Sequence, residues 1–191
     1  LKQLANAFDP CHFQVVCVRR DRREAADGHW LARFWRQLPA AGQSVLFYRS
    51  WYRRVLDDRL VGQVADKDIA RAFDEINEFE AQQRDYGTLI VKLYFDVSAA
   101  VQAQRLAERA ANPWHEALRY EVPLAADHPG YAQALEDLRD NSDTRWSPWR
   151  IIDGNDENRA AAEALEAVLD AYRAAMPSEP PQLVRTDGRA A

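Results

Sequence analysis

The chain has 191 residues, of which 47% are hydrophobic and 29% are charged, and its formal net charge is −5. This length is enough for one domain with a buried core, and the composition is ordinary for a globular protein. The absence of a run of about 18 apolar residues argues against a membrane span. We expect a cytoplasmic protein without a secretory leader. Because the chain starts with Leu1 rather than Met, we also expect an incomplete N-terminus.

The first half of the chain alternates helical and apolar segments. Residues 1–8 have the spacing of a helix end, and residues 29–37 have the spacing of a second helix. Residues 13–18 and 44–48 are short apolar runs, which predict strands. The segment between the first strand and the second helix, residues 19–28, is predicted to be a charged loop.

The clearest helix is predicted over residues 68–86, with Gly87 as its C-terminal cap. Its apolar face contains Ile69, Phe73, Ile76, Phe79 and Gln83. Further elements are expected as a strand over 88–97, a helix capped by Ser98, a helix over 131–140, a strand over 149–152 and a helix over 157–175.

The helix after Ser98 has two distinct faces. Alanines and one leucine predict an inner face formed by Ala99, Ala103, Leu106, Ala107 and Ala110. Gln102, Arg105 and Arg109 fall together on the opposite, polar side. We therefore expect the alanine face to pack on the protein and the arginines to face solvent or a ligand.

Strands that alternate with helices predict the α/β class, with a parallel sheet between two helical layers. Ligands of such sheets bind at the carboxyl ends of the strands. Phe47-Tyr48-Arg49-Ser50-Trp51-Tyr52 lies at that end of the second strand. Arginines beside aromatic side chains suit an anionic ligand, because guanidinium binds phosphate in a fork and stacks on rings.

Positive charge is concentrated in one part of the chain. Of 25 basic residues 22 are arginine, and residues 19–59 contain ten arginines against five acidic residues. A coding bias explains the preference for arginine over lysine, but it does not explain the clustering. Two interpretations stay open: a solvated surface and an anion site, which includes a site for a polyanion.

The cysteines and histidines give no metal signature. Cys11 and Cys17 flank the first predicted strand, where either a disulfide or free buried thiols can occur, and a reducing cytoplasm favours the thiols. Four scattered histidines without paired cysteines do not form a zinc motif.

Several rare residue combinations together resemble the family-2 polyphosphate kinases, over about residues 1–172. The matching residues are Leu4 with Phe8-Asp9-Pro10; Leu31, Arg33-Phe34-Trp35-Arg36 and Leu38-Pro39; Phe47, Arg49-Ser50-Trp51-Tyr52 and Arg54-Val55-Leu56; Glu75-Ile76-Asn77 with Phe79-Glu80; Lys92; Gln104-Arg105 and Arg109; and Asp143-Thr144 with Ser147-Pro148-Trp149. The blocks that combine tryptophan and arginine carry most of the specificity.

The resemblance implies a three-layer P-loop kinase-like fold that moves phosphoryl groups between inorganic polyphosphate and a nucleotide, ADP or AMP, with the help of Mg²⁺. It implies one domain over residues 1–175 with a helical lid at about 99–145, followed by a disordered tail at 176–191. No nucleic acid or membrane partner is expected, and a homo-oligomer is compatible with the family.

The sequence departs from the family pattern at three points. A Gly-rich phosphate-gripping loop with its lysine is absent from the 191 residues, and the central strand that carries this loop would be absent with it. Tyr48 stands where the family has an acidic residue that holds or orients magnesium. The lid should carry lysines, but in residues 114–120 Arg119 is the one basic side chain suited to replace them. Asp57 and Asp58 are weak substitutes for the acidic residue, because they lie over two helical turns away.

Six arginines are the candidate site residues. The resemblance implies catalytic roles for Arg49, Arg105 and Arg109, and phosphate-binding roles for Arg33, Arg36 and Arg54. The alternative for each is an ordinary surface arginine that pairs with a carboxylate. Trp51, Tyr52, Glu75, Asn77 and Glu80 are expected to have structural roles.

Three functional hypotheses follow from these observations. The first is a polyphosphate-dependent nucleotide phosphotransferase, of which this chain alone is inactive. The second is a non-catalytic domain that binds polyphosphate or stabilises an assembly, which the replacement at Tyr48 favours. The third is a different P-loop kinase that acts on nucleoside monophosphates.

Overall fold

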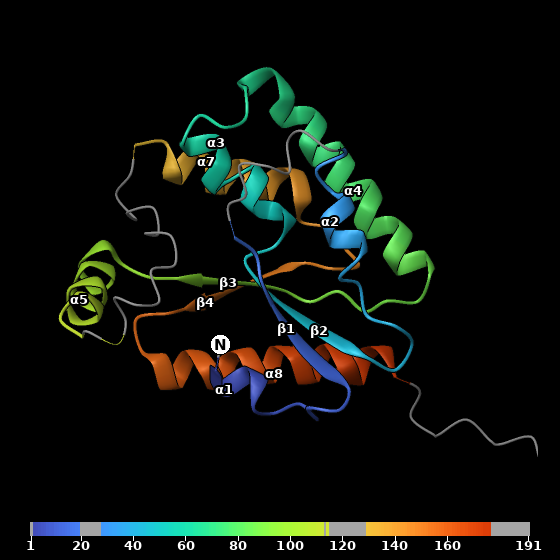
Figure 1. Cartoon of the computed structure of the whole chain (residues 1–191). Coiled ribbons are helices and arrows are strands. Elements are labelled where there is room, and N and C mark those ends of the chain that lie inside the picture. Colours follow the sequence, from blue (N-terminus) through green and yellow to red (C-terminus); the bar gives the residue numbers. More distant parts are fainter. Residues whose placement is uncertain (1, 20–27, 113, 115–128, 177–191) are drawn as a thin grey trace, which may run out of the picture.

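A computed structural model of the protein describes residues 2–19, 28–112, 114 and 129–176 (Figure 1). The expected charged loop at 19–28, the middle of the expected lid and the expected tail lie almost entirely outside these residues. The elements are, in chain order, α1 (Lys2–Ala5), β1 (Phe13–Cys17), α2 (Ala32–Trp35), β2 (Ser44–Tyr48), the 3₁₀ turns η2 (Trp51–Arg54) and η3 (Asp66–Asp68) on either side of α3 (Asp57–Leu60), α4 (Ile69–Asp85), β3 (Lys92–Asp96), α5 (Ala99–Ala110), α7 (Tyr131–Ser142), β4 (Trp149–Asp153) and α8 (Glu157–Ala175).

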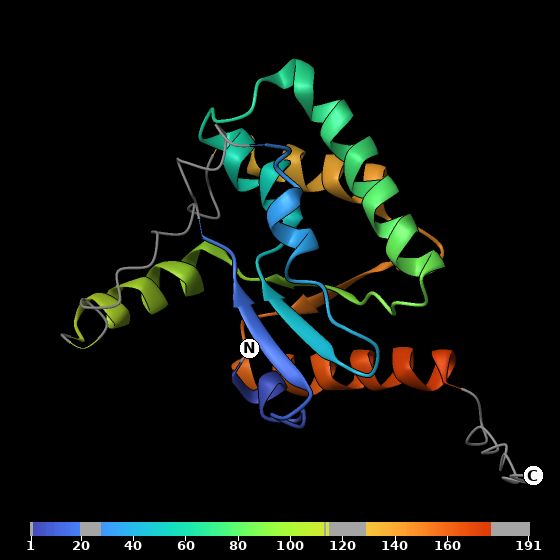
Figure 2. The ribbon, with the colours of Figure 1, turned by 45° about the vertical axis from the view of Figure 1, so that its right-hand side comes forward.

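The strands lie between two helical layers, as the sequence predicts. Helices α1 and α8 cover one side of the strands, and α2, α3, α4 and α7 cover the other side (Figures 1 and 2). Ser44 on β2 and Tyr172 on α8 share a hydroxyl hydrogen bond of 3.0 Å, which ties the lower layer to the strands. The fold is therefore a three-layer α/β arrangement, and the predicted α/β class is confirmed.

The described strands form two parallel pairs. β1 pairs with β2 from Phe13–Ser44 to Cys17–Tyr48, and β3 pairs with β4 from Lys92–Trp149 to Asp96–Asp153. The expected strand over 88–97 is shorter than predicted. It begins only at Lys92, because its partner β4 begins at Trp149 and offers no hydrogen-bonding residues opposite 88–91.

One main core lies between the strands and the upper layer. The side chains of α4 that periodicity selects are all buried in the structure, as predicted. The core is formed by Val18, Leu31, Phe34, Trp51, Tyr52, Val55, Val64, Ile69, Ala72, Phe73, Ile76, Phe79 and Leu138. A smaller cluster of Ile152, Ala160 and Ala164 lies between β4 and α8. Because Leu138 is on α7, this part of the expected lid region belongs to the main core.

The end of α4 is also as predicted. Gly87 has a φ of 96°, in the left-handed region that glycine adopts without steric cost. Its amide donates to the carbonyl of Arg84, and the amide of Thr88 donates to that of Gln83. These hydrogen bonds satisfy carbonyl groups that the last turn of the helix leaves without partners.

The predicted packing of α5 is wrong. Ser98 caps the helix as expected, but Ala99, Ala103, Ala107 and Ala110 are exposed, and α5 has no buried residue. The half-buried side instead includes Gln102 and Arg105, and of the predicted inner face only Leu106 is half-buried. Alanine offers little apolar area, so its burial gains less than the hydrogen bonds that Arg105 forms with backbone carbonyls.

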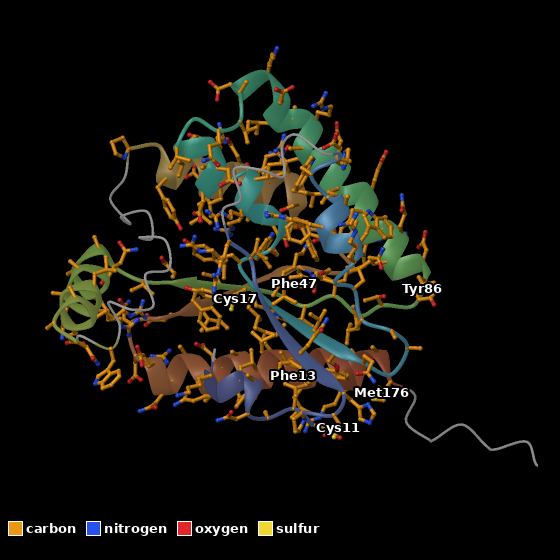
Figure 3. All side chains as sticks on the ribbon, viewed as in Figure 1. Cys11, Phe13, Cys17, Phe47, Tyr86 and Met176 are labelled. Carbon is orange, nitrogen blue, oxygen red and sulfur yellow. The ribbon has the colours of Figure 1, made fainter. Side chains whose placement is uncertain are left out.

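The expected burial of the cysteine thiols is also wrong. Cys11 and Cys17, which Figure 3 labels near the two ends of β1, are free thiols, as predicted, but both are exposed. β1 has a second strand, β2, on one side only among the described residues, and three of its five side chains are exposed. A strand at such a position does not shield its thiols from solvent.

Candidate functional site

The carboxyl end of β2 places Arg49 in an unusual backbone conformation. Arg49 has a φ of 57° and is the one non-glycine residue with positive φ among the described residues. Such a conformation costs roughly 1–3 kcal/mol and persists where neighbouring contacts hold it. Nη1 of Arg49 lies 3.0 Å from Oδ2 of Asp57, and the two side chains are only 22% and 14% exposed.

Asp57 therefore lies much closer to Arg49 than the sequence spacing indicates. Between the two residues the chain passes through η2, a short 3₁₀ turn, before α3 begins at Asp57. Ser50 caps this turn and accepts a hydrogen bond from the amide of Tyr52. Arg49 therefore pairs with a carboxylate of the same chain. This is the pairing expected of an ordinary arginine, the alternative to a catalytic role.

Two tyrosines and a second aspartate are linked electrostatically to the Arg49–Asp57 pair. The hydroxyl groups of Tyr94 on β3 and Tyr131 on α7 are 3.0 Å apart. Burial raises the pKa of both, and Asp57 and Asp96 raise it further, while the charge of Arg49 lowers the pKa of Tyr131. We call Arg49, Asp57, Tyr94, Asp96 and Tyr131 the strand-end cluster. Its tyrosines are uncharged at neutral pH.

Tyr48 is the last residue of β2 and is 47% exposed. Its carbonyl accepts a hydrogen bond of 3.0 Å from the amide of Val18, which extends the β1–β2 ladder. A neutral phenol is a poor ligand for a hard cation such as magnesium, which prefers carboxylate oxygens. Among the described residues, no group of three or more His, Cys, Asp or Glu side chains is arranged to hold a metal ion. The side chain at position 48 therefore does not supply the carboxylate that the family pattern places there for Mg²⁺.

The three predicted phosphate-binding arginines lie on the upper layer, at α2 and η2. Arg33 lies over the ring of Phe34 at 4.7 Å and donates to the carbonyl of Arg19. Arg54 lies over the ring of Trp30 at 4.9 Å, and burial lowers its pKa despite the nearby Glu75. Arg36 follows α2 directly and is exposed.

Glu75 organises the same region from α4. Its carboxylate accepts a hydrogen bond of 2.6 Å from Nε1 of Trp30 and lies 3.5 Å from Nε2 of His29. Burial alone would raise the pKa of Glu75, but these partners and Arg71 outweigh burial and lower it. Glu75 thus has the structural role that was expected.

A buried polar network lies directly beneath the turn after Arg49. Glu80 is 0% exposed and accepts hydrogen bonds from Nε1 of Trp51 at 2.9 Å and from the hydroxyl of Tyr52 at 2.7 Å. Nζ of Lys92 lies 3.1 Å from the same carboxylate and donates to the carbonyl of Ser142 at 2.7 Å. We call Trp51, Tyr52, Glu80, Lys92 and Ser142 the buried polar network.

The network joins four elements: η2, α4, β3 and the end of α7. Burial lowers the pKa of Lys92, whereas the charge of Glu80 acts in the opposite direction. Burial and then the charge of Glu80 raise the pKa of Tyr52. The rings of Tyr52, Trp146 and Trp149 also surround the ammonium group at 5.6–5.7 Å from their centroids. These contacts fix the turn that follows Arg49.

The two arginines expected in the lid lie apart from α2. Arg105 donates to the carbonyls of Gly154 at 2.8 Å and Asn155 at 2.9 Å, and it lies 3.4 Å from Glu157. It thereby anchors α5 to the β4–α8 loop. Arg109 is exposed on the same helix. In both ribbon views α5 projects away from α2, so the structure does not bring these arginines to Arg33 and Arg36 (Figures 1 and 2).

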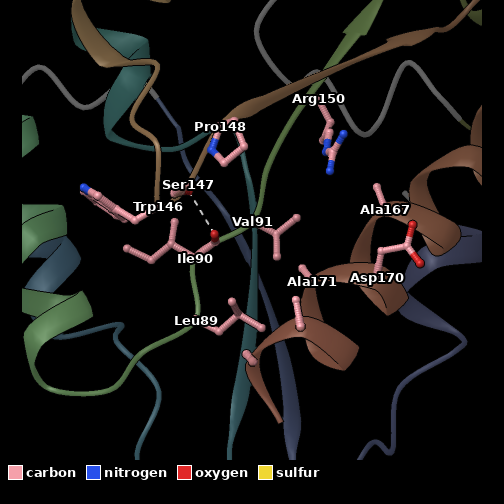
Figure 4. Close-up of a pocket in the computed structure, with 12 residues that line it drawn as sticks. Leu89, Ile90, Val91, Trp146, Ser147, Pro148, Arg150, Ala167, Asp170 and Ala171 are labelled. Atoms are coloured by element: carbon pink, nitrogen blue, oxygen red, sulfur yellow. Dashed lines mark hydrogen bonds between the residues drawn. The ribbon is translucent and has the colours of Figure 1, made fainter.

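An apolar pocket of about 500 Å³ opens elsewhere, between the chain before β3, the start of β4 and α8 (Figure 4). Leu89, Val91 and Ala171 are among its lining residues, and the hydroxyl of Ser147 donates to the carbonyl of Ile90 across its wall. None of the six candidate arginines lines it. This pocket is not the predicted anion site.

Comparison with known proteins decides the family. The model of the family described as polyphosphate kinase 2 matches residues 1–180. The chain belongs to the polyphosphate kinase 2 family. A solved structure of a polyphosphate kinase 2 from Pseudomonas aeruginosa is 34% identical with a TM-score of 0.80, over 90% of this chain and 37% of that one. The polyphosphate kinase 2 of Arthrobacter aurescens is 27% identical with a TM-score of 0.82, over 93% and 64%.

Relatives in this family are named as phosphotransferases that act on polyphosphate and a nucleotide. The polyphosphate:AMP phosphotransferase of Pseudomonas aeruginosa is 33% identical over 180 residues, which cover 92% of this chain and 36% of the relative. The GDP-polyphosphate phosphotransferase of Mycolicibacterium smegmatis is 28% identical, over 90% and 62%. The chain thus spans about a third of the length of the first of these relatives.

Proposed function

We propose that the protein to which this chain belongs transfers phosphoryl groups between inorganic polyphosphate and a nucleotide. The match to the polyphosphate kinase 2 family over residues 1–180 carries this proposal. The relatives named above act on AMP or GDP, so we propose a nucleoside monophosphate or diphosphate as the acceptor class. Cytoplasmic location and homo-oligomer formation remain part of the proposal. Within the described residues, no helix is both long and apolar enough to cross a membrane.

The strand-end cluster is the proposed phosphate site of this chain. Arg49 follows a parallel strand at the edge where α/β proteins bind ligands, and its largely buried guanidinium can donate to phosphate oxygens. Arg33, Arg36 and Arg54 add positive charge on the upper layer and would meet further phosphates of the chain. Arg105 and Arg109 would approach only if α5 moves, as lids of phosphotransferases do.

Electrostatic stabilisation is the chemistry that these residues can supply. Positive charge placed against the equatorial oxygens of a migrating phosphoryl group lowers the barrier to transfer, and no covalent enzyme intermediate is required. Because Tyr48 does not supply the expected carboxylate, we derive no step through a metal ion. Tyr48 also favours the second candidate function, a non-catalytic domain that binds polyphosphate.

Binding tests the site itself. We expect the chain to bind long-chain polyphosphate with an affinity that falls steeply as salt rises, because each arginine contact releases counterions. Arg49→Ala should weaken binding about 10- to 100-fold, since a hydrogen bond to a charged group contributes about 1.5–3 kcal/mol. Arg173→Ala, an exposed arginine on α8, is the matched control and should have little effect. Absence of binding at every salt concentration would contradict the proposal.

Turnover separates the two candidate functions. The 191-residue chain, incubated with polyphosphate, magnesium and AMP or ADP, should form nucleotide product far more slowly than the roughly one turnover per second of ordinary kinases. Nucleotide products are followed by chromatography. In a longer chain that also carries a Gly-rich phosphate-gripping loop with its lysine, Tyr48→Asp should raise the rate. Turnover near one per second in the unaltered chain would show that Tyr48 is not inactivating.

A further inference from the structure

The pairing of Arg49 with Asp57 has a consequence for any anion that approaches the strand-end cluster. Asp57 is the first residue of α3, and its carboxylate contacts the guanidinium of Arg49 at 3.0 Å. Both side chains are mostly shielded from solvent, at 22% and 14% exposed, so water screens their attraction less than it screens an exposed pair. The positive charge of Arg49 is therefore already balanced within the chain.

The position of Asp57 is fixed by rigid neighbours. The intervening turn contains Trp51 and Tyr52, which are 6% and 5% exposed and donate to Glu80. Val55 is completely buried one turn later. A buried turn of this kind delivers Asp57 to Arg49 in one geometry and helps hold the strained φ of Arg49.

The other members of the strand-end cluster give the anion no compensating charge. Tyr94 and Tyr131 are neutral, and Asp96 contributes a second negative charge to the surroundings of both tyrosines. A phosphate that binds Arg49 must thus displace the carboxylate of Asp57 or tolerate its repulsion.

We propose that Asp57 is an internal competitor of phosphate at Arg49, whose carboxylate must leave the guanidinium before a phosphate group can take its place. The inference rests on the proposed phosphate site. Asp57 weakens phosphate binding, and it also keeps Arg49 in its strained position while no anion is bound. It is a specificity residue of the site and makes no direct contact with the phosphate that replaces it.

Removal of the competing charge should tighten binding. Inorganic tripolyphosphate is the probe, titrated calorimetrically at constant salt. Asp57→Asn should raise its affinity about tenfold, since the amide keeps the shape of the carboxylate but not its charge. Asp57→Glu, which keeps the charge, should leave affinity near that of the unaltered chain. Asp85→Asn makes the same change in net charge at the end of α4, where Asp85 pairs with Arg84, and should alter affinity less than about twofold.

A double substitution tests whether the gain acts through Arg49. In Arg49→Ala the further change Asp57→Asn should give no increase in affinity, because the guanidinium for which the carboxylate and the phosphate compete is no longer present. Equal gains from Asp57→Asn with and without Arg49, or from Asp57→Asn and Asp85→Asn, would overturn the inference while leaving the phosphate site in place. Failure of every variant to bind tripolyphosphate would overturn both the site and the inference. Circular dichroism of each variant excludes unfolding as the cause.

Discussion

Glu80→Ala is expected to lower the free energy of unfolding by roughly 3–5 kcal/mol, the typical cost of removing one partner from a buried ion pair. The substitution would leave the amino group of Lys92, which is 4% exposed, without its carboxylate partner. It would also remove the acceptor of Trp51 and Tyr52. Urea denaturation, followed by circular dichroism and tryptophan fluorescence, measures the loss.

Glu78→Ala is the matched control for this prediction. Glu78 is an exposed glutamate on the same helix, so its loss should change stability by less than about 0.5 kcal/mol. The double variant Glu80→Gln with Lys92→Met should lose less free energy of unfolding than the sum of the two single variants. Each single change leaves one buried charge unpaired, whereas the double change removes both charges. Equal stability of the Glu80 and Glu78 variants would mean that the network contributes nothing to folding.

Phe34→Ala is expected to have an effect of similar size, roughly 3–5 kcal/mol, because it opens a cavity in the main core. Phe34 is 1% exposed, and its ring makes edge contacts with Trp30, Phe47 and Trp51 at centroid distances of 5.7–6.4 Å. The same denaturation experiment measures the loss. Phe95→Ala removes an equal volume from a phenylalanine that is 38% exposed and should cost much less. Similar losses for both variants would contradict a core centred on Phe34.

Local patterns predicted the strands and α4 well, because both depend on burial of one face. Ser44–Tyr48 matches the predicted strand at both ends, and α4 buries the stripe that its periodicity selects. A short strand and a long amphipathic helix carry their signal within the segment itself, so no distant partner has to be known.

Contacts between distant residues could not be predicted in the same way. The sequence marks Glu80 and Lys92 as parts of separate motifs, but nothing in their spacing indicates that they meet in the core. The buried face of α5 was predicted wrongly for a related reason. Arg105 donates to backbone carbonyls about fifty residues away in the chain, which its local sequence does not indicate.

The candidate site was predicted in part. The aromatic-arginine motif correctly marked the end of β2 as charged and aromatic, and the structural roles of Trp51 and Glu80 are borne out by their contacts. The pairing of Asp57 with Arg49 was not predicted, because the sequence does not show how the segment between them, which contains the 3₁₀ turn η2, places α3 beside Arg49. The roles of the six arginines in binding stay predictions.

The helix α5 illustrates how unevenly stability is distributed in this chain. A helix of twelve residues is marginal in water unless one face is packed, and no residue of α5 is buried. Its main restraints are the Ser98 cap and the contacts of Arg105 with the β4–α8 loop. Fraying or swinging of this arm therefore breaks few interactions and leaves the hydrophobic interior intact. The two arginines that it carries are attached to one of the most easily displaced parts of the described molecule.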